Sequence, residues 1–274
     1  MDSSPSLQAI QLKIIQQIEQ AGAEVAVALR SFSETHFLYH NENMIFHAAS
    51  TMKIAVMLEV FSQVESGKIA LTDRLETRNL FKSVIDGSAY SLELEYDEEQ
   101  IASASTRTIS QLCEAMITVS SNLATNLLIQ HVGVENIQAC LRSIRADSMQ
   151  VLRGLEDTRA FESGLSNTTT AKALLIQLEA LANHQFLTPT ACDAMIAILK
   201  RQEWVDAIPA GVRSGTVVAN KTGEITGIHH DAAIVYADIP YVLVILTRGI
   251  DNREDSAHLI ANITRIIDVA IRQL

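Results

Sequence analysis

The feature that most constrains this chain is β-strand sequence near both ends, separated by a long helical middle. Residues 24–29 and 36–39 have the composition of two strands joined by a polar turn. Val- and Ile-rich segments return only far downstream, at residues 213–220, 230–236 and 241–247. If all five segments belong to one sheet, the residues between them must form an insertion. We therefore expect two lobes, one of which contains the sheet.

Amphipathic helices flank the predicted sheet. Apolar residues at three- and four-residue intervals predict a helix over residues 7–18, and a second helix is expected from about residue 254 to 274. The expected fold class is α+β: residues 1–48 and 210–274 form an α/β lobe with a five-stranded antiparallel sheet. Residues 49–209 are expected to form an all-helical lobe, and the groove between the lobes is where ligands are expected to bind.

The composition excludes several classes of protein. A chain of 274 residues with 48% hydrophobic and 19% charged residues has enough apolar sequence for a core and is not expected to be disordered. Its longest apolar run, residues 241–246, is far shorter than the roughly 20 residues of a membrane-spanning helix. The N-terminus lacks the basic and apolar regions of a signal peptide. The polar, acidic stretch from 93 to 108 is expected to be a solvated loop.

The net charge of −11 repels polyphosphate, so nucleic acid is not an expected partner. The three cysteines, Cys113, Cys140 and Cys192, form no C-x-x-C pair and are expected to be buried thiols. Adjacent residues on a strand point to opposite faces, so His229 and His230 are not expected to chelate one metal. We expect neither a metal nor an organic cofactor, while the oligomeric state stays open.

A serine and a lysine lie three residues apart at the start of a predicted helix. Ser50 precedes the apolar segment 54–61, and Lys53 would lie one turn later on the same face. A desolvated lysine can be neutral enough to take the proton of a serine hydroxyl, and free N–H groups at a helix start can hold an oxyanion. By itself, this pair favours a simple helix cap.

Two further motifs change this balance. Ser-Ser-Asn at residues 120–122 places a hydroxyl and an amide just before a helical pattern, although capping would also explain it. Lys-Thr-Gly at residues 221–223 follows the predicted strand 213–220. A glycine there lets a substrate lie along the strand edge, while Lys221 offers a positive charge to a carboxylate.

With these three motifs in this order, the chain resembles the penicillin-recognising serine acyltransferases, in particular class A β-lactamases and their serine-hydrolase relatives. Residues 117–128 resemble that family's second motif with its helix, except that serine stands at 121 where aspartate is usual. The lobe order also matches the family's split sheet, so the resemblance spans nearly the whole chain. It implies a hydrolase that works through an acyl-serine intermediate on a small-molecule substrate, either a β-lactam or a D-Ala-D-Ala-like compound. Members of the family are usually exported, although a cytoplasmic location stays open for this chain.

The resemblance implies a role for each matching residue. Ser50 would attack a carbonyl, Lys53 would take its proton and Ser120 would protonate the leaving nitrogen. The residues that would bind substrate or line the oxyanion site are Asn122, Lys221, Thr222, Gly223 and Glu224. Within this set, Lys221 and Thr222 would bind a carboxylate, and the amide of Glu224 would form the oxyanion hole with that of Ser50.

The resemblance also implies a loop glutamate that activates the deacylating water. Residues 153–170 contain the family's threonine run after a loop that looks shortened, and this loop has two glutamates. Glu162 keeps the local Glu-x-x-Leu pattern, whereas Glu156 lies at a more family-like distance beyond Ser120. We favour Glu156 and keep Glu162 as the alternative, or neither if both are solvated. Asn167 stands where the family's anchor is aspartate, so an ion pair that fixes the loop is expected to be missing.

Two smaller expectations follow from the same resemblance. Some family members form a disulfide between the position of Cys113 and the position four residues after the catalytic lysine, which here is Met57, so that disulfide is not expected. A catalytic role for His229 and His230 is not expected, whereas contact with substrate stays open.

Three functions remain in view. The first is a class A-type serine β-lactamase that hydrolyses the β-lactam amide. The second is a D-alanyl-D-alanine peptidase or esterase-like penicillin-binding relative, which differs in how fast water removes the acyl group. The third is a non-catalytic penicillin-binding sensor, and the intact Ser50, Lys53 and Lys221 count against it.

Overall fold

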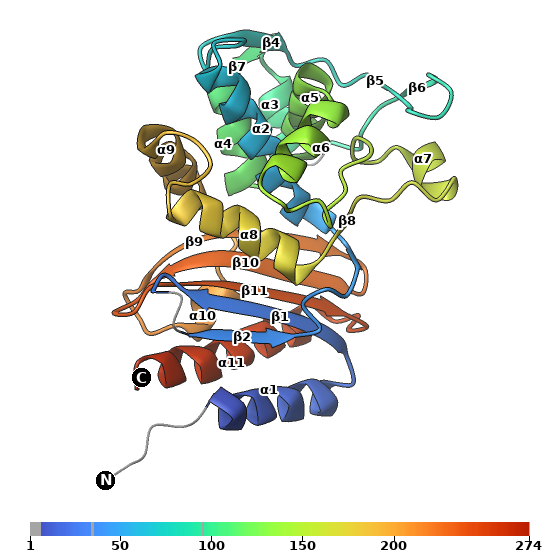
Figure 1. Ribbon diagram of the computed structural model, residues 1–274. Coiled ribbons are helices and arrows are strands. Elements are labelled where there is room, and N and C mark those ends of the chain that lie inside the picture. The colour runs from blue at the N-terminus through green and yellow to red at the C-terminus, as the bar shows by residue number, and fades with distance from the viewer. Residues whose placement is uncertain (1–6, 34–35, 95, 274) are drawn as a thin grey trace.

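The computed structural model describes residues 7–33, 36–94 and 96–273, and its larger sheet contains the five predicted strands (Figure 1). Neighbouring strands are antiparallel, in the order β2-β1-β11-β10-β9. Their bounds are β1 Glu24–Ser31, β2 Phe37–His40, β9 Val217–Ile225, β10 Ile228–Tyr236 and β11 Tyr241–Arg248. The first and last strands of the chain are therefore direct neighbours, with Val25 opposite Thr247. The prediction of one sheet built from both ends of the chain is confirmed.

Helices cover both faces of this sheet (Figure 1). The terminal helices α1 (Leu7–Ala21) and α11 (Arg253–Ile271) lie on one face, together with the short α10 (Ile208–Gly211). Helix α8 (Ala171–Ala182) and the rest of the helical lobe cover the other face. Side chains of β1 alternate between the two layers: Val25, Val27 and Leu29 belong to the core under the terminal helices, whereas Ala26 and Ala28 belong to the core of the helical lobe.

The second lobe is mostly helical, as predicted. Its remaining helices are the 3-10 helix η1 (Ala49–Met52), α2 (Lys53–Glu65), α3 (Tyr96–Ala102), α4 (Ile109–Thr118), α5 (Asn122–Val132), α6 (Val134–Ser143), α7 (Thr158–Glu162) and α9 (Pro189–Leu199).

Among the described residues, three short antiparallel ladders accompany these helices, so the lobe is not all-helical. They are β3 (Phe46–His47) with β8 (Thr168–Thr169), β4 (Arg74–Glu76) with β7 (Thr106–Thr108), and β5 (Phe81–Lys82) with β6 (Ala89–Tyr90). Strands of two or three residues are too short to show an alternating pattern in the sequence.

Two sequence expectations are wrong in detail. The acidic stretch 93–108 is not a solvated loop, because it contains α3 and because Glu98 is only 8% exposed. Strand β9 begins at residue 217 rather than 213, since a turn at Gly215 with φ +83° precedes it, and it runs on to residue 225. The Lys-Thr-Gly motif therefore lies inside the strand, where Lys221 pairs with Ala232 and Gly223 with His230.

The three cysteines are free and buried. Within the described ranges, no three His, Cys, Asp or Glu side chains lie close enough together to hold a metal ion. No helix among the described residues is long and apolar enough to cross a membrane.

Candidate active site

Ser50 lies in η1, which leads directly into α2 and packs against β9. Strand β9 can approach η1 so closely only because residue 223 is glycine. A Cβ atom at Gly223 would lie 3.0 Å from the amide nitrogen of Ser50 and 2.9 Å from that of Thr51. The strand edge is therefore in van der Waals contact with the backbone that carries the candidate nucleophile.

Backbone strain gathers around Ser50. Six non-glycine residues in the described part of the chain have positive φ, and three of them, Ala49 (+45°), Ser120 (+62°) and Glu156 (+61°), are candidate site residues or adjacent to one. Each such conformation costs roughly 1–3 kcal/mol and persists only where the surrounding structure holds it. The clustering supports the assignment of this region as the functional site.

Lys53 is fully buried at the base of the site. Its Nζ atom donates to the backbone oxygen of Ser120 (2.6 Å), to Ser120 Oγ (3.1 Å) and to Asn122 Oδ1 (2.9 Å). Burial lowers the pKa of Lys53 well below its usual value, and the neighbouring Lys221 lowers it further, although Glu98 and Glu156 oppose this shift. The amine is therefore easier to deprotonate than that of an exposed lysine.

Lys221 reaches the same hydroxyl from β9. It is fully buried, and its Nζ donates to Ser120 Oγ (3.0 Å) and to the backbone oxygen of Thr222 (2.8 Å). Burial lowers its pKa to about 7, although Asp231 opposes the shift. Ser120 Oγ thus lies between two buried amines whose positive charges disfavour each other.

The segment that carries Ser120 and Asn122 is braced by a residue that sequence analysis missed. Glu98, on α3, accepts hydrogen bonds from Ser121 Oγ (2.9 Å), the amide of Asn122 (2.5 Å) and the amide of Leu123 (3.0 Å). Ser121 also caps α5, because its Oγ accepts from the amide of Ala124. No local pattern marked Glu98, since its partners lie 23 to 25 residues further along the chain.

Glu156 lies next to Asn122, whereas Glu162 does not. Glu156 Oε1 accepts from Asn122 Nδ2 (3.1 Å), and Oε2 accepts from the amide of Glu93 (3.1 Å). The backbone of the preceding residue, Leu155, is held by both polar side-chain atoms of Asn126, since Nδ2 donates to its carbonyl and Oδ1 accepts from its amide. Glu162 is exposed at the end of α7 and lies outside the lining of the two clefts beside Ser50.

The loop that contains Glu156 is fixed by a neutral amide. Asn167 is 2% exposed, and its Oδ1 accepts from the amides of Leu152 (2.8 Å) and Arg153 (3.2 Å), while its Nδ2 donates to the Arg153 carbonyl (3.0 Å). The side chain of Arg153 donates to the Leu165 and Gly154 carbonyls instead. Asn167 thus fixes the loop through backbone hydrogen bonds rather than an ion pair.

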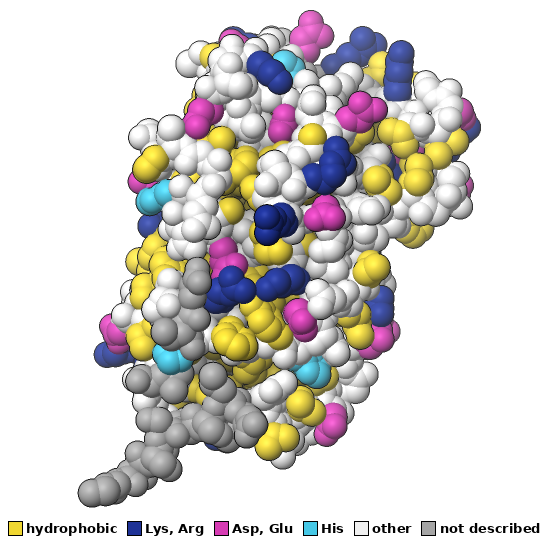
Figure 2. All heavy atoms as spheres, in the orientation of Figure 1, with side chains coloured by type: hydrophobic (Ala, Val, Ile, Leu, Met, Phe, Trp, Pro, Cys, Tyr) yellow, Lys and Arg dark blue, Asp and Glu magenta, His cyan; other side chains and the backbone are white. Residues whose placement is uncertain are grey.

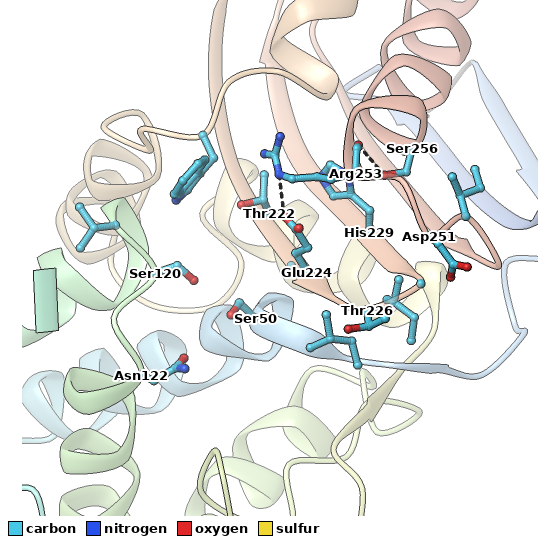
Figure 3. Close-up of a pocket in the computed structure, with 17 residues that line it drawn as sticks. Ser50, Ser120, Asn122, Thr222, Glu224, Thr226, His229, Asp251, Arg253 and Ser256 are labelled. Atoms are coloured by element: carbon cyan, nitrogen blue, oxygen red, sulfur yellow. Dashed lines mark hydrogen bonds and ion pairs between the residues drawn. The ribbon is translucent and has the colours of Figure 1, made fainter. Parts of the chain in front are cut away.

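Clefts open on two sides of Ser50. The larger, about 800 Å³, is lined on the sheet side by Thr222, Glu224 and His229, with Ser120 and Asn122 on the side of the helical lobe (Figure 3). Arg253 crosses it, with ion pairs to Glu224 (2.8 Å) and Asp206 (2.5 Å). The smaller, about 300 Å³, is lined by Glu156, Phe161 and other residues of the helical lobe and by Glu224 and Ile225 of β9.

The two adjacent histidines face opposite sides of the sheet, as predicted. His229 Nδ1 lies 2.9 Å from Ser256 Oγ of α11, and His229 lines the larger cleft. His230 Nε2 lies 2.9 Å from the backbone oxygen of His47, and its ring packs edge-on against Phe46.

Exposed apolar side chains gather where the β5–β6 turn meets α7, at the outer edge of the helical lobe (Figure 2). Val84, Ile85 and Phe161 contribute to this surface, and Phe161 also lines the smaller cleft. The rim of that cleft is therefore partly apolar.

Comparisons with known proteins agree with this geometry. A model described as the Beta-lactamase enzyme family matches residues 9–270. A β-lactamase of Bacillus licheniformis is 31% identical over 173 residues, and one of Rhodobacter capsulatus is 29% identical over 175 residues. These alignments cover 60% and 63% of this chain but only 56% of each relative. The solved structure of PBP-A superposes with a TM-score of 0.85 at 23% identity over 97% of this chain and 96% of that one, which shows a shared fold.

The match to the family model takes in both lobes and the three motifs that meet between them. The chain therefore belongs to the β-lactamase enzyme family.

Proposed function

We propose that this protein hydrolyses the amide of β-lactams through an acyl intermediate on Ser50. One observation carries the proposal: two buried lysines converge on the hydroxyl of Ser120, and one of them, Lys53, begins the helix that directly follows η1, which carries Ser50. A protein that only bound a ligand would have no need for two desolvated amines with lowered pKa values.

In the acylation step, Ser50 Oγ attacks the carbonyl carbon and its proton passes to the neutral amine of Lys53, directly or through a relay. Neutral Lys53 keeps two N–H bonds, which suit Ser120 O and Asn122 Oδ1, the two contacts that can only accept. Its lone pair then faces the Ser120 hydroxyl. As the C–N bond breaks, Ser120 gives its proton to the leaving nitrogen, and Lys221 or Lys53 replaces it.

The approach of β9 to η1 supplies the rest of the site. The amide of Ser50 and that of Glu224 are the proposed donors to the oxyanion, and Gly223 lets β9 and η1 come close enough together. Lys221 and Thr222 are the proposed partners of a substrate carboxylate, with Asn122 holding the amide on the other side.

Deacylation is assigned to Glu156. Asn122 accepts from Lys53 and donates to Glu156, so one amide connects the acylating amine with the proposed base for water. A carboxylate placed there can remove a proton from water that attacks the acyl carbonyl.

A second candidate is a penicillin-binding protein that deacylates slowly. Both oxygens of Glu156 accept hydrogen bonds from protein N–H groups, which compete with a water molecule for its lone pairs. A mutant of PBP-A, which shares this fold, was solved as an acyl-enzyme complex with penicillin G.

Intact-protein mass spectrometry with penicillin G and a chromogenic cephalosporin tests both candidates. A β-lactamase should show a transient adduct with continuous turnover, whereas a penicillin-binding protein should keep the adduct. Ser50→Ala should abolish the adduct while the fold remains, since Ser50 caps neither η1 nor α2, whose N-caps are Ala48 and Met52. An adduct that survives in this variant, or no adduct in the wild type, contradicts the proposal.

A further inference from the structure

Glu98 is a buried carboxylate that none of the motifs includes. It is 8% exposed, and no ion pair among the described residues includes it. A carboxylate without a cationic partner is costly to bury unless N–H and O–H donors surround it. Its donors all belong to three consecutive residues, Ser121 to Leu123.

These donors lie at the N-terminus of α5, an 11-residue helix. The free amides and the positive end of the helix dipole favour a negative charge at this point. Ser121 itself is neutral, so Glu98 supplies the negative charge from another helix. The carboxylate thus determines where the first turn of α5 lies relative to α3.

The same turn determines the surroundings of Lys53. All three hydrogen bonds of Lys53 run to Ser120 and Asn122, the two residues on either side of Ser121. Asn122 is held at its amide by Glu98 and at its side chain by Lys53 and Glu156. A shift of this turn would move the acceptors of Lys53 and the hydroxyl that is proposed to protonate the leaving group.

We propose that Glu98 is a positioning residue for acylation: its negative charge, supplied from α3, holds Ser120 and Asn122 against Lys53. The inference rests on the proposed function of Ser50 and Lys53. Under this proposal Glu98 provides the negative charge at the start of α5 that the neutral Ser121 does not provide.

The charge of Glu98 also acts on Lys53 through space. The charged groups that face Lys53 are Lys221 from β9, which lowers its pKa, and Glu98 from α3 and Glu156 from the loop, which raise it. Replacing Glu98 by glutamine keeps the shape and removes one of the two opposing charges. The pKa of Lys53 should then fall further, and the acidic limb of the acylation profile should move to lower pH.

The test compares Glu98→Gln, the double variant Glu98→Gln with Ser121→Asp, and the control Glu99→Gln, which changes an exposed neighbour on α3. Acylation by a chromogenic cephalosporin is followed from pH 5 to 9. The pKa of Lys53 is measured by NMR with ¹³C-labelled lysine, and its signal among the seven lysines is the one missing from Lys53→Arg. Glu98→Gln should be acylated roughly 10- to 100-fold more slowly, because small displacements of reacting groups typically cost this much in rate. Its Lys53 should titrate at lower pH than in the wild type.

The control Glu99→Gln should match the wild type in rate and in titration. The double variant moves the carboxylate to position 121, so the logarithm of its acylation rate should recover at least half of the drop seen in Glu98→Gln. Wild-type rate and titration in Glu98→Gln overturn the inference. So does a slow variant whose Lys53 titration is unmoved and whose rate the double variant does not restore, because Glu98 would then only stabilise the fold.

If the wild type forms no adduct, the proposed function fails, and the Lys53 titration still decides the inference: a lower pKa in Glu98→Gln supports it and an unchanged one overturns it. If Glu98→Gln does not fold, Glu98→Asp keeps the charge but is too short to reach all three donors. It should acylate more slowly with Lys53 titrating as in the wild type, and a wild-type rate would count against positioning.

Discussion

The close contact between β9 and the segment that carries Ser50 can be tested with Gly223→Ala. The new Cβ would lie 2.9 Å from Thr51 N and 3.0 Å from both Ser50 N and Thr51 Cγ2. Two of these atoms belong to the backbone and cannot rotate away. Ordinary contact returns only if the strand and η1 separate by about half an ångström.

Such a separation has a cost in stability and a larger cost in rate. Overpacking of this kind typically lowers the free energy of unfolding by about 1–3 kcal/mol. The moved amide of Ser50 is a proposed oxyanion donor, and complete loss of one donor costs roughly 10²–10³-fold. Because a misplacement of about 1 Å costs roughly 10²-fold, we expect Gly223→Ala to be acylated about 10- to 100-fold more slowly.

The assay combines urea unfolding with the rate of adduct formation by intact mass. The matched control is Gly211→Ala in α10, where a Cβ would overlap the Ala261 carbonyl and lie 2.5 Å from Thr264 Cβ, on the other face of the sheet. This control should also lose stability, yet its folded fraction should be acylated at the wild-type rate. A wild-type rate in Gly223→Ala would refute the reasoning, and so would an equal slowing in both variants.

Three further predictions concern the loop and the buried amines. Glu156→Gln should accumulate an acyl adduct that clears about 10²–10⁴-fold more slowly, while Glu162→Gln should clear it normally by time-resolved mass spectrometry; the opposite result assigns the role to Glu162. Asn167→Ala leaves buried backbone groups unpaired, so urea unfolding should show a free energy of unfolding lower by about 1–3 kcal/mol or more. Deacylation should be slowed more than acylation, and equal slowing of both steps would contradict a role in the loop alone. The pKa of Lys221 is about 7 in the folded protein and near 10.5 in the unfolded chain, so the unfolded chain binds more protons between these pH values. The free energy of unfolding should therefore rise with pH across this window. Lys221→Met should reduce that slope, and an unchanged slope would refute the assignment.

The sequence was sufficient to predict the elements that have a clear composition or period. Strand-like composition predicted β1 and β10, and an amphipathic pattern predicted α1 and α11. It failed where neighbouring segments decide the structure. Strand β9 continues through a lysine and a glycine because β10 pairs with it, and the two-residue ladders have no period of their own.

The site was predictable to the extent that its chemistry lies in short motifs. The structure brings Ser120 within hydrogen-bond distance of both Lys53 and Lys221, which the motifs suggested only through the family resemblance. Glu98 was not predictable, because a carboxylate in an acidic stretch looks the same whether it faces water or a helix end. Its burial is decided by the packing of α3 against α5, which no local pattern reveals.

The pairing of β1 with β11 has a consequence for how the protein is made. Glu24 of β1 and Arg248 of β11 form an ion pair although they lie 224 residues apart in the sequence, so β11 is synthesised long after β1. At ribosomal rates of about 5–20 residues per second, that interval lasts roughly 10 to 45 seconds. Contacts within the helical lobe are more local and can form first, while the edge of β1 remains open to wrong partners. Ser50 emerges early, but the strand that carries Lys221 follows only near the end. If Ser50 is acylated as we propose, we expect the serine of the nascent chain to stay unreactive until the sheet is nearly complete, and reactivity towards an acylating probe would then report how far the newly made molecule has folded.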